Sequence, residues 1–249
     1  MNVKQYLQRI QIKEDPGLNL ESLAGLQEQH VLSIPFENLD VMNGVPIPLN
    51  VQAYFNKIIK KDRGGFCYEL NGLFHWLLGE LGFSNYLIAC TVRSGGNRWA
   101  IPESHASQIV ELDQPYLVDV GFGDTARIPL PLTGEVRKDI SGNFRVVESG
   151  DGYFHKQKKV EGEWVTRFRF LNKERQLEDF AEVCHYNQSS PDSHFTQRRL
   201  VTMATPEGRL TLSGNTLTIT ENQERQKKEV EESQISKLLV DKFGISIRN

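Results

Sequence analysis

One stretch of this sequence predicts a turn followed directly by a helix: Arg63-Gly64-Gly65-Phe66-Cys67-Tyr68-Glu69-Leu70-Asn71. The two adjacent glycines allow a tight turn, because glycine has no Cβ. Apolar residues then recur at helical spacing as far as Gly82, which is a suitable stop. A helix that begins at Cys67 directs its free N–H groups and the positive end of its dipole toward the thiol. We expect this environment to favour the thiolate, the reactive form of cysteine, so Cys67 is the candidate nucleophile.

The sequence before this stretch has the pattern of two helices. Residues 3–10 and 20–30 place apolar side chains at helical spacing, and Asp15-Pro16-Gly17 separates them. Asn19 is a suitable cap for the second helix. Pro35 lacks a backbone N–H, so that helix cannot continue smoothly through it. The first third of the chain is therefore expected to be helical.

After the stretch, the pattern changes to that of antiparallel strands. Strands are predicted at residues 85–93, 106–112, 115–122, 144–149, 153–160 and 163–170. Gly150-Asp151-Gly152 and Glu161-Gly162-Glu163 have the composition of hairpin turns. The middle of the chain is therefore expected to form a barrel or a folded sheet.

The end of the chain predicts strands and one helix. The strands are expected at residues 199–204, 208–212 and 216–220. The final helix is amphipathic and carries Ile235, Leu238, Leu239 and Phe243. The charged run 224–232 leads into it and is expected to be the solvated face of a helix.

Composition excludes several classes of function. The 249 residues fit one large domain or two to three small ones, with hydrophobic and charged fractions of 39% and 24% that are ordinary for a soluble globular protein. The net charge of -3 gives no electrostatic case for binding nucleic acid. No apolar run approaches the roughly 20 residues that a membrane helix needs, and the N-terminus lacks the layout of a signal peptide. We expect neither nucleic acid nor membrane as a partner.

The chain has three cysteines, Cys67, Cys90 and Cys184, at wide spacings. None forms a CxxC pair or a Cys/His cluster with zinc-ligand spacing, so no metal site is expected. An odd number of widely spaced cysteines also argues against a disulfide framework, and a reducing cytoplasm fits best. Cys90 lies in a predicted buried strand and is interpreted as a core residue, as is Cys184.

A cysteine nucleophile needs a base within hydrogen-bond reach and a third group that orients the base. Among the histidines, His105 is the candidate base, because it lies at a loop-to-strand junction, where a rigid support often holds functional side chains. His30 and His75 lie in helical patterns and are interpreted as packed or surface residues. Asp119 lies in an apolar strand, where a carboxylate is costly unless it is paired. Antiparallel pairing of the two strands would bring Asp119 to His105.

Four motifs resemble those of the arylamine N-acetyltransferase family, in the same order and over nearly the whole chain. They are Ile34-Pro35-Phe36-Glu37-Asn38-Leu39-Asp40, then Arg63-Gly64-Gly65-Phe66-Cys67-Tyr68-Glu69, then Asp119-Val120-Gly121-Phe122-Gly123, then Thr205-Pro206-Glu207-Gly208 with Thr211-Leu212-Ser213-Gly214. Each motif alone is weak, and their combination is specific. The long inserted loop of the eukaryotic members is absent, which implies an open cleft of bacterial type.

The resemblance implies an α+β fold in three parts. These are an N-terminal helical bundle over residues 1–84 with Cys67, a central antiparallel β-barrel over 85–188 with His105 and Asp119, and a C-terminal α/β lid over 189–249. The core is expected to be related to those of cysteine proteases and transglutaminases.

The resemblance also implies an activity: transfer of an acetyl group from acetyl-CoA to an arylamine or hydrazine by a ping-pong mechanism. Cys67, His105 and Asp119 would form the catalytic triad, and an acetyl-cysteine would be the intermediate. Acetyl-CoA would be the co-substrate, and no metal is needed. Arg63 and Glu37 are expected to pair and to hold the first motif against the second.

Further contacts are predicted around the triad. Apolar walls for an aromatic amine are assigned to Phe36, Phe66 and Phe122. Contacts to the CoA arm are assigned to Ser104, Gly121, Phe122 and Gly123, with Ser213, Gly214 and Thr216 from the lid. Gly121 and Gly123 allow a ligand to approach the backbone closely.

Three alternatives remain open. A cysteine peptidase or transglutaminase-like enzyme would use the same triad on peptides or glutamine side chains. An amide synthase of the same family would close an aromatic amine onto a polyketide chain. A binding module that kept the fold and lost the chemistry is disfavoured by the presence of all three triad residues.

Overall fold

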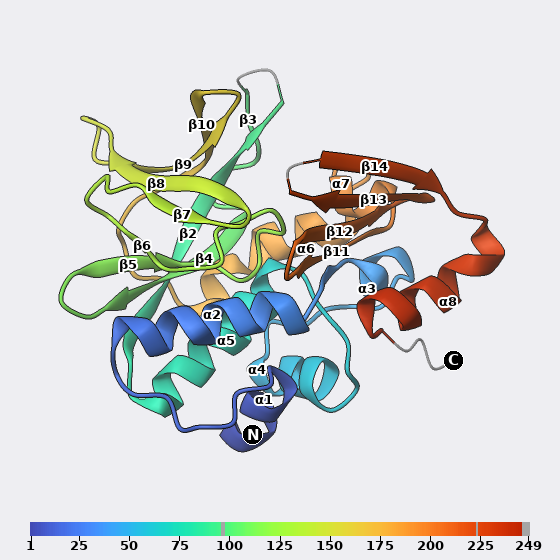
Figure 1. Ribbon diagram of the computed structural model, residues 1–249, viewed down its shortest axis with the longest axis horizontal. Coiled ribbons are helices and arrows are strands. Elements are labelled where there is room, and N and C mark those ends of the chain that lie inside the picture. The colour runs from blue at the N-terminus through green and yellow to red at the C-terminus, as the bar shows by residue number, and fades with distance from the viewer. Residues whose placement is uncertain (96–97, 223, 246–249) are drawn as a thin grey trace.

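The computed structural model describes residues 1–95, 98–222 and 224–245. Two antiparallel sheets lie side by side, and helices from the first third of the chain run beneath them (Figure 1). The larger sheet is the barrel-like one at the upper left of Figure 1, and the smaller C-terminal sheet lies at the upper right. This mixture of helices and antiparallel sheets confirms the predicted α+β class.

The helices of the first third surround one long buried helix. They are α1 (Val3–Arg9), α2 (Leu20–Ser33), α3 (Leu39–Met42), α4 (Val51–Tyr54), a π-helix (Phe55–Ile59) and α5 (Cys67–Leu81). The expected cap is confirmed, because the Asn19 side chain accepts a hydrogen bond from the backbone N–H of Ser22 at 2.9 Å. Gly82 ends α5 with a positive φ of 95°, which glycine adopts without strain. The short helices between 39 and 59 have no clear apolar period and were not expected.

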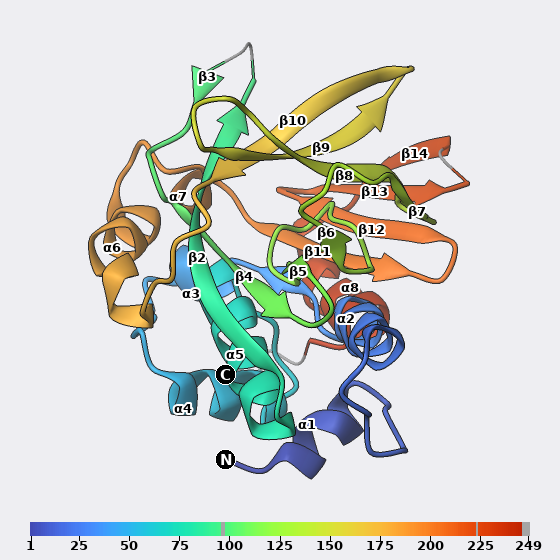
Figure 2. The same ribbon diagram turned by 90° about the vertical axis from the view of Figure 1, so that its left-hand side faces the viewer.

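The larger sheet curls into a nearly closed barrel. Its strands are β2 (Ser84–Ser94), β3 (Arg98–Trp99), β4 (His105–Glu111), β5 (Pro115–Val118), β6 (Leu130–Pro131), β7 (Arg137–Asp139), β8 (Gly142–Glu148), β9 (Phe154–Val160) and β10 (Glu163–Phe170). Their order is β6-β5-β4-β2-β10-β9-β8-β7, with β3 paired to β2, and β6 comes back to lie near β8. Figure 2 shows the long strand β2 rising from the helical layer through this sheet. The predicted barrel is confirmed.

One predicted strand is shorter than expected. The run 115–122 was expected to be extended throughout, but β5 ends at Val118. Asp119 turns the chain inward, since its Oδ1 accepts the backbone N–H of Gly121 at 3.0 Å and the N–H of Val120 bonds the Asn71 side chain at 2.9 Å. The polar contacts of Asp119 therefore replace the pairing of a continuing strand.

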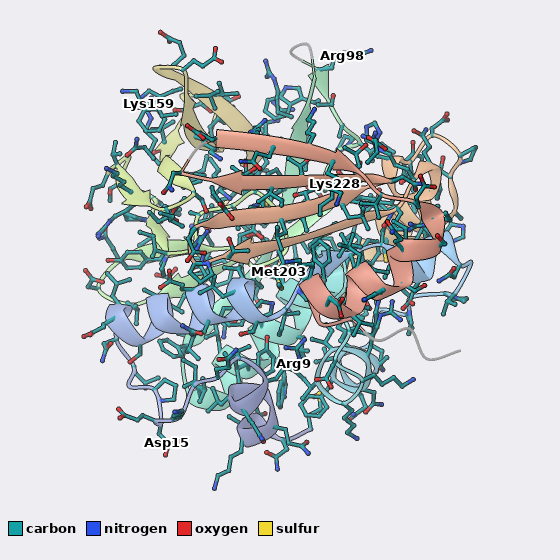
Figure 3. The ribbon with its side chains drawn as sticks, turned by 45° about the vertical axis from the view of Figure 1, so that its right-hand side comes forward. Arg9, Asp15, Arg98, Lys159, Met203 and Lys228 are labelled. Carbon is teal, nitrogen blue, oxygen red and sulfur yellow. The ribbon has the colours of Figure 1, made fainter. Side chains whose placement is uncertain are left out.

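The smaller sheet combines one strand from the first third of the chain with strands from its C-terminal part. It contains β1 (Phe36–Glu37), β11 (Leu200–Thr205), β12 (Gly208–Ser213), β13 (Thr216–Glu221) and β14 (Glu224–Glu229), in that order. The remaining helices are a 3-10 helix (Leu177–Phe180), α6 (Ala181–Ser189), α7 (His194–Gln197) and α8 (Glu232–Phe243). Figure 3 shows this sheet with Lys228 on β14 and Met203 on β11, the strand nearest the helices. The boundaries 1–84, 85–188 and 189–249 stay a prediction, and β1 shows that the first part contributes a strand to the sheet of the last.

The prediction for the charged run 224–232 was wrong. Residues 224–229 form the edge strand β14, which pairs with β13, and only Glu232 begins α8. Every residue of β14 is exposed, so the run carries no apolar face by which a helix could pack. Charged side chains on an edge strand also discourage pairing with other molecules.

In the parts of the chain that the structure describes, no helix is long and apolar enough to cross a membrane.

Candidate active site

Cys67 is the first residue of α5, and only 3% of its surface is exposed. The preceding turn pairs with the first motif, since the N–H of Glu37 donates to the carbonyl of Gly65 at 2.8 Å. A Cβ on Gly64 would lie 2.1 Å from the carbonyl oxygen of Pro35, so this approach requires glycine. The first motif and the turn before Cys67 are therefore held together through their backbones.

Five buried or half-buried charged side chains hold this turn, and we call them the turn network: Glu37, Asp40, Lys57, Arg63 and Glu69. Arg63 donates Nε and Nη2 to Glu37 Oε1 at 3.0 and 2.7 Å, which confirms the expected pairing. Lys57 Nζ lies 2.8 Å from Asp40 Oδ2 and 2.9 Å from Glu69 Oε1. Sequence reasoning missed these last three residues, because each looks like a solvated helix or loop charge.

His105 and Asp119 meet as expected from antiparallel pairing. His105 begins β4, and Asp119 directly follows β5, its neighbour in the sheet. The distance from His105 Nε2 to Asp119 Oδ2 is 3.0 Å, and the two residues are 4% and 2% exposed. Burial by itself would raise the pKa of Asp119, but the charges of His105 and Lys156 and the hydrogen bonds from His105 and Asn71 hold it well below its ordinary value.

Asn71 connects the helix of the thiol to both strands. Its Nδ2 donates to Asp119 Oδ1 at 3.0 Å and to the carbonyl of Ala106 at 2.7 Å. Its Oδ1 accepts the N–H of Val120 at 2.9 Å. Asn71 follows Cys67 by four residues and so lies on the same face of α5. That spacing was the one signal available in the sequence, and the prediction did not use it.

The helix start is one of several influences on the Cys67 thiol. Burial raises the pKa of the Cys67 thiol strongly, and hydrogen bonding with the backbone of Ala106 and Tyr68 offsets this only in part. Ala106 directly follows His105 in β4, so the sulfur lies at the start of the strand that carries the imidazole. Proton transfer from the thiol therefore requires a base, and His105 lines the same cavity as Cys67.

Cys67 and His105 open onto a cavity of about 490 Å³ between the barrel, α6, α7 and the C-terminal sheet. The predicted residues that line it are Phe36, Cys67, Ser104, His105, Gly121, Phe122 and Gly123. Phe66 is not among the described lining residues, since it is fully buried and its ring packs edge-on against Tyr68 and Phe195. The lid residues Ser213, Gly214 and Thr216 also lie outside the lining described here.

The C-terminal sheet contributes lining residues that the sequence reasoning did not identify: Thr202, Arg209 and Thr211. They precede the predicted lid residues by a few positions, on strands whose register the sequence did not predict. Arg209 is the charged one, and its Nη2 is buried without a hydrogen-bond partner among the described residues. Asp124 lines the cavity beside it and is held by Lys158 Nζ at 2.8 Å.

Gly121 lies directly against the start of the helix that carries Cys67. A Cβ at this position would lie 2.9 Å from Cys67 Cα and 2.7 Å from Asn71 Nδ2. Gly123 has a positive φ of 79°, a conformation that favours glycine. The Asp119–Gly123 segment thus approaches the start of α5 more closely than side chains would permit.

The other histidines are not part of the candidate triad. His30 is fully buried, its Nδ1 is 2.8 Å from the Tyr6 hydroxyl, and burial lowers its pKa to about 3. His75 pairs with Asn85. His194 lines the cavity from α7, a position that the sequence did not indicate. Among the residues that the structure describes, no group of His, Cys, Asp and Glu is arranged to hold a metal ion.

Comparison with known proteins gives consistent relatives. A family model described as N-acetyltransferase matches residues 19–249. Arylamine N-acetyltransferase of Mycolicibacterium smegmatis is 32% identical, over 99% of this chain and 93% of the relative. The solved arylamine N-acetyltransferase of Salmonella typhimurium superposes with a TM-score of 0.94 at 28% identity, over 99% and 92% of the two chains. An enzyme of Bacillus cereus superposes at 0.92 with 27% identity over 99% and 100%, and it is described as having a unique Cys-His-Glu catalytic triad.

Proposed function

The chain belongs to the arylamine N-acetyltransferase family, and from that premise we propose that it moves an acetyl group from acetyl-CoA to an aromatic amine or hydrazine by way of acetylated Cys67. The observation that carries the proposal is one cavity that contains both Cys67 and His105, with His105 held by Asp119 at 3.0 Å. An Asp is the acid here, whereas the Bacillus cereus relative is described with a Glu. A cytoplasmic location is part of the same proposal.

In the first half-reaction, His105 takes the proton of the Cys67 thiol. Its Nε2 faces Asp119, so Nδ1 is the nitrogen left for this exchange. The sulfur attacks the thioester carbonyl of acetyl-CoA, and the backbone N–H of Cys67 is a candidate donor to the oxyanion. The intermediate collapses, the C–S bond to CoA breaks, and the imidazolium returns the proton to the departing thiolate.

In the second half-reaction, the amine nitrogen attacks the acetyl-cysteine carbonyl. His105 takes the proton that the nitrogen loses and returns it to the sulfur of Cys67 as the C–S bond breaks. Asp119 stays ionised throughout and keeps the imidazole in one orientation. The products are the N-acetylated amine and free Cys67, so the cycle closes without a metal or a redox step.

The walls of the cavity fit these two substrates. Phe36, Phe122 and Phe195 give the apolar surface that an aromatic ring needs. The phosphates of the donor need positive charge, and Arg209 offers it from the C-terminal sheet. Arg209 therefore joins Ser104 and Gly123 as a proposed donor contact.

The direct test is the mass of the intact protein after incubation with acetyl-CoA alone. We expect a gain of one acetyl group in the wild type and none in Cys67→Ala, while Cys184→Ala, the matched control at a second buried thiol, keeps the gain. Adding an arylamine should then remove the acetyl group. Absence of the adduct in folded wild-type protein, together with cleavage of peptides, would reverse the proposal in favour of a peptidase.

A second measurement concerns the donor site. Arg209→Gln removes the positive charge and keeps the polar contact, so we expect KM for acetyl-CoA to rise about tenfold with little change in kcat, as for the loss of one charged hydrogen bond. An unchanged KM would remove Arg209 from the donor site.

Turnover of simple arylamines at ordinary rates would count against an amide synthase.

A further inference from the structure

A lysine lies in the barrel core next to the proposed triad. Lys156 is on β9, and only 1% of its surface is exposed. Its Nζ is 3.8 Å from Asp119 Oδ2, the same oxygen that faces His105 Nε2 at 3.0 Å. Lysine is almost never buried to this extent without a partner. Lys156 is not among the residues that line the cavity, so it lies on the side of Asp119 away from the cavity lining.

The surroundings hold this ammonium group in one place. Nζ donates a hydrogen bond to the hydroxyl of Thr125. It lies 4.9 Å from the ring centroid of Phe168 and 5.1 Å from that of Phe122, distances at which aromatic faces attract a cation. Burial lowers the pKa of Lys156, and the charge of Asp119 opposes this effect.

We propose that Lys156 is a positioning residue that keeps Asp119 ionised and sets the pH above which Cys67 becomes reactive. The proposal rests on the proposed function in taking Cys67 and His105 as the reacting pair. It adds a fourth group to the three that the sequence indicated. Lys156 touches neither substrate, and its effect passes through Asp119.

The balance of charges gives the physical reason. With thiolate, imidazolium, carboxylate and ammonium all ionised, the charges of the four groups sum to zero, and all four side chains are buried. Without Lys156 the same state carries an uncompensated negative charge, which a low-dielectric interior penalises.

The direction of the effect follows from the same charges. Removing the ammonium makes the Cys67 thiolate form at a higher pH. The pH above which Cys67 becomes reactive therefore moves upward.

Other charged and titratable groups face Lys156 and belong in the same balance. They are Asp124 beyond β5, Arg167 on β10 and Cys90 on β2. Arg167 Nη2 lies 3.9 Å from Asp124 Oδ2, so these two charges largely offset each other. Cys90 is fully buried, and burial raises its pKa well above the ordinary value, so it contributes no charge.

The test measures alkylation of Cys67 by iodoacetamide against pH, read by peptide mass, with no acetyl-CoA or amine present. Because the readout is the thiol itself, it can fail while acetyl transfer is intact, and the reverse. We expect Lys156→Met to raise the pH at which Cys67 alkylation reaches half its maximal rate by about one unit, the shift typical of losing one nearby charge. Lys156→Arg should restore the wild-type value. Lys158→Met is the matched control, because Lys158 pairs with Asp124 at 2.8 Å instead of Asp119, and it should leave this pH unchanged.

A folded Lys156→Met protein whose Cys67 is alkylated over the wild-type pH range would overturn the proposal and leave Lys156 a space-filling residue. A second measurement tests the pairing of Lys156 with Asp119 even if the Lys156→Met protein folds poorly. Asp119→Asn leaves the buried ammonium without its counter-charge, so its Tm should fall. Adding Lys156→Met to Asp119→Asn should then raise Tm above that of Asp119→Asn alone. A double variant no more stable than Asp119→Asn would refute the pairing.

Discussion

Two buried clusters of charge flank Cys67, and they differ in what they can reach. The turn network ties Glu37, Arg63 and their partners around the turn before the helix, and none of the five lines the cavity that the structure describes. The triad cluster on the other side joins Asp119, His105, Asn71 and Lys156, and its histidine opens onto that cavity. Buried charge alone is therefore a poor guide to chemistry.

The contrast also shows how each cluster is balanced. In the turn network, three carboxylates face two cations, and these ion pairs hold backbone segments together. In the triad cluster, one carboxylate oxygen faces both an imidazole and an ammonium group, and the imidazole lies at the cavity. Variants should accordingly separate into those that lose stability and those that lose rate.

The largest effect is expected from Asp119→Asn on the triad side. Without the carboxylate, the imidazole loses the group that orients it and stabilises its protonated form, so kcat/KM should fall about 10³- to 10⁴-fold. Steady-state kinetics with an arylamine, well below Tm, provide the measurement. A loss smaller than tenfold would place the orienting role elsewhere and erase the distinction between the clusters.

Arg63→Met tests the turn network. Glu37 is fully buried, and its remaining cationic partner among the described residues would be Lys57, 3.8 Å away, so the free energy of unfolding should fall by about 3 kcal/mol. Urea denaturation measures this loss, and the pH dependence of Cys67 alkylation should not change. Arg137→Met is the control, since its partner Glu135 is exposed and such pairs contribute at most about 1 kcal/mol. A shifted pH dependence of Cys67 alkylation in Arg63→Met would mean that the two clusters are coupled.

Gly121→Ala tests the contact between the triad segment and the helix of the thiol. The added Cβ would meet Cys67 Cα at 2.9 Å, so the two segments must separate, and kcat/KM should fall on the order of 10- to 100-fold. Gly150→Ala, where nothing lies within 4 Å, is the control and should change little. Wild-type kinetics for Gly121→Ala would show that the close approach is not needed for catalysis.

The smallest effect concerns Glu69 of the turn network. Burial raises its pKa to about 7, although Lys57 opposes the shift. The folded protein therefore holds this proton to a higher pH than the unfolded chain does. The contribution of Glu69 to stability is full below about pH 4.5 and is lost as the pH rises through 7. Tm followed from pH 5 to 8 should fall in the wild type and fall less in Glu69→Gln; equal slopes would assign the pH dependence to another group.

Residues with a local signal were predictable. Cys67 follows two glycines and opens an apolar helix, and the structure places it at the first residue of α5. His105 and Asp119 lie at the ends of neighbouring strands, and their meeting follows from the short connection between those strands. Local signals work here because turns, helix starts and hairpins depend on residues close together in the chain.

Residues without a local signal were missed. Lys156 belongs to a strand that also carries Lys158 and Lys159, and only the register of the barrel makes it the buried residue of β9. Arg209 likewise reaches the cavity because β12 pairs with β11 beside Phe36. The charged run 224–229 reads equally well as an exposed helix or as an edge strand, and pairing with β13 decided between them.

By itself, the sequence determined the family, the α+β class, the order of helices and strands and the three residues proposed for catalysis. Only the tertiary structure decided the surroundings of those residues. It buries the Cys67 thiol, which raises its pKa, and it places Lys156 3.8 Å from Asp119 although 37 positions (156 minus 119) separate them in the chain. Charge interactions and desolvation depend on distance through space, and the sequence does not contain those distances until the barrel has closed.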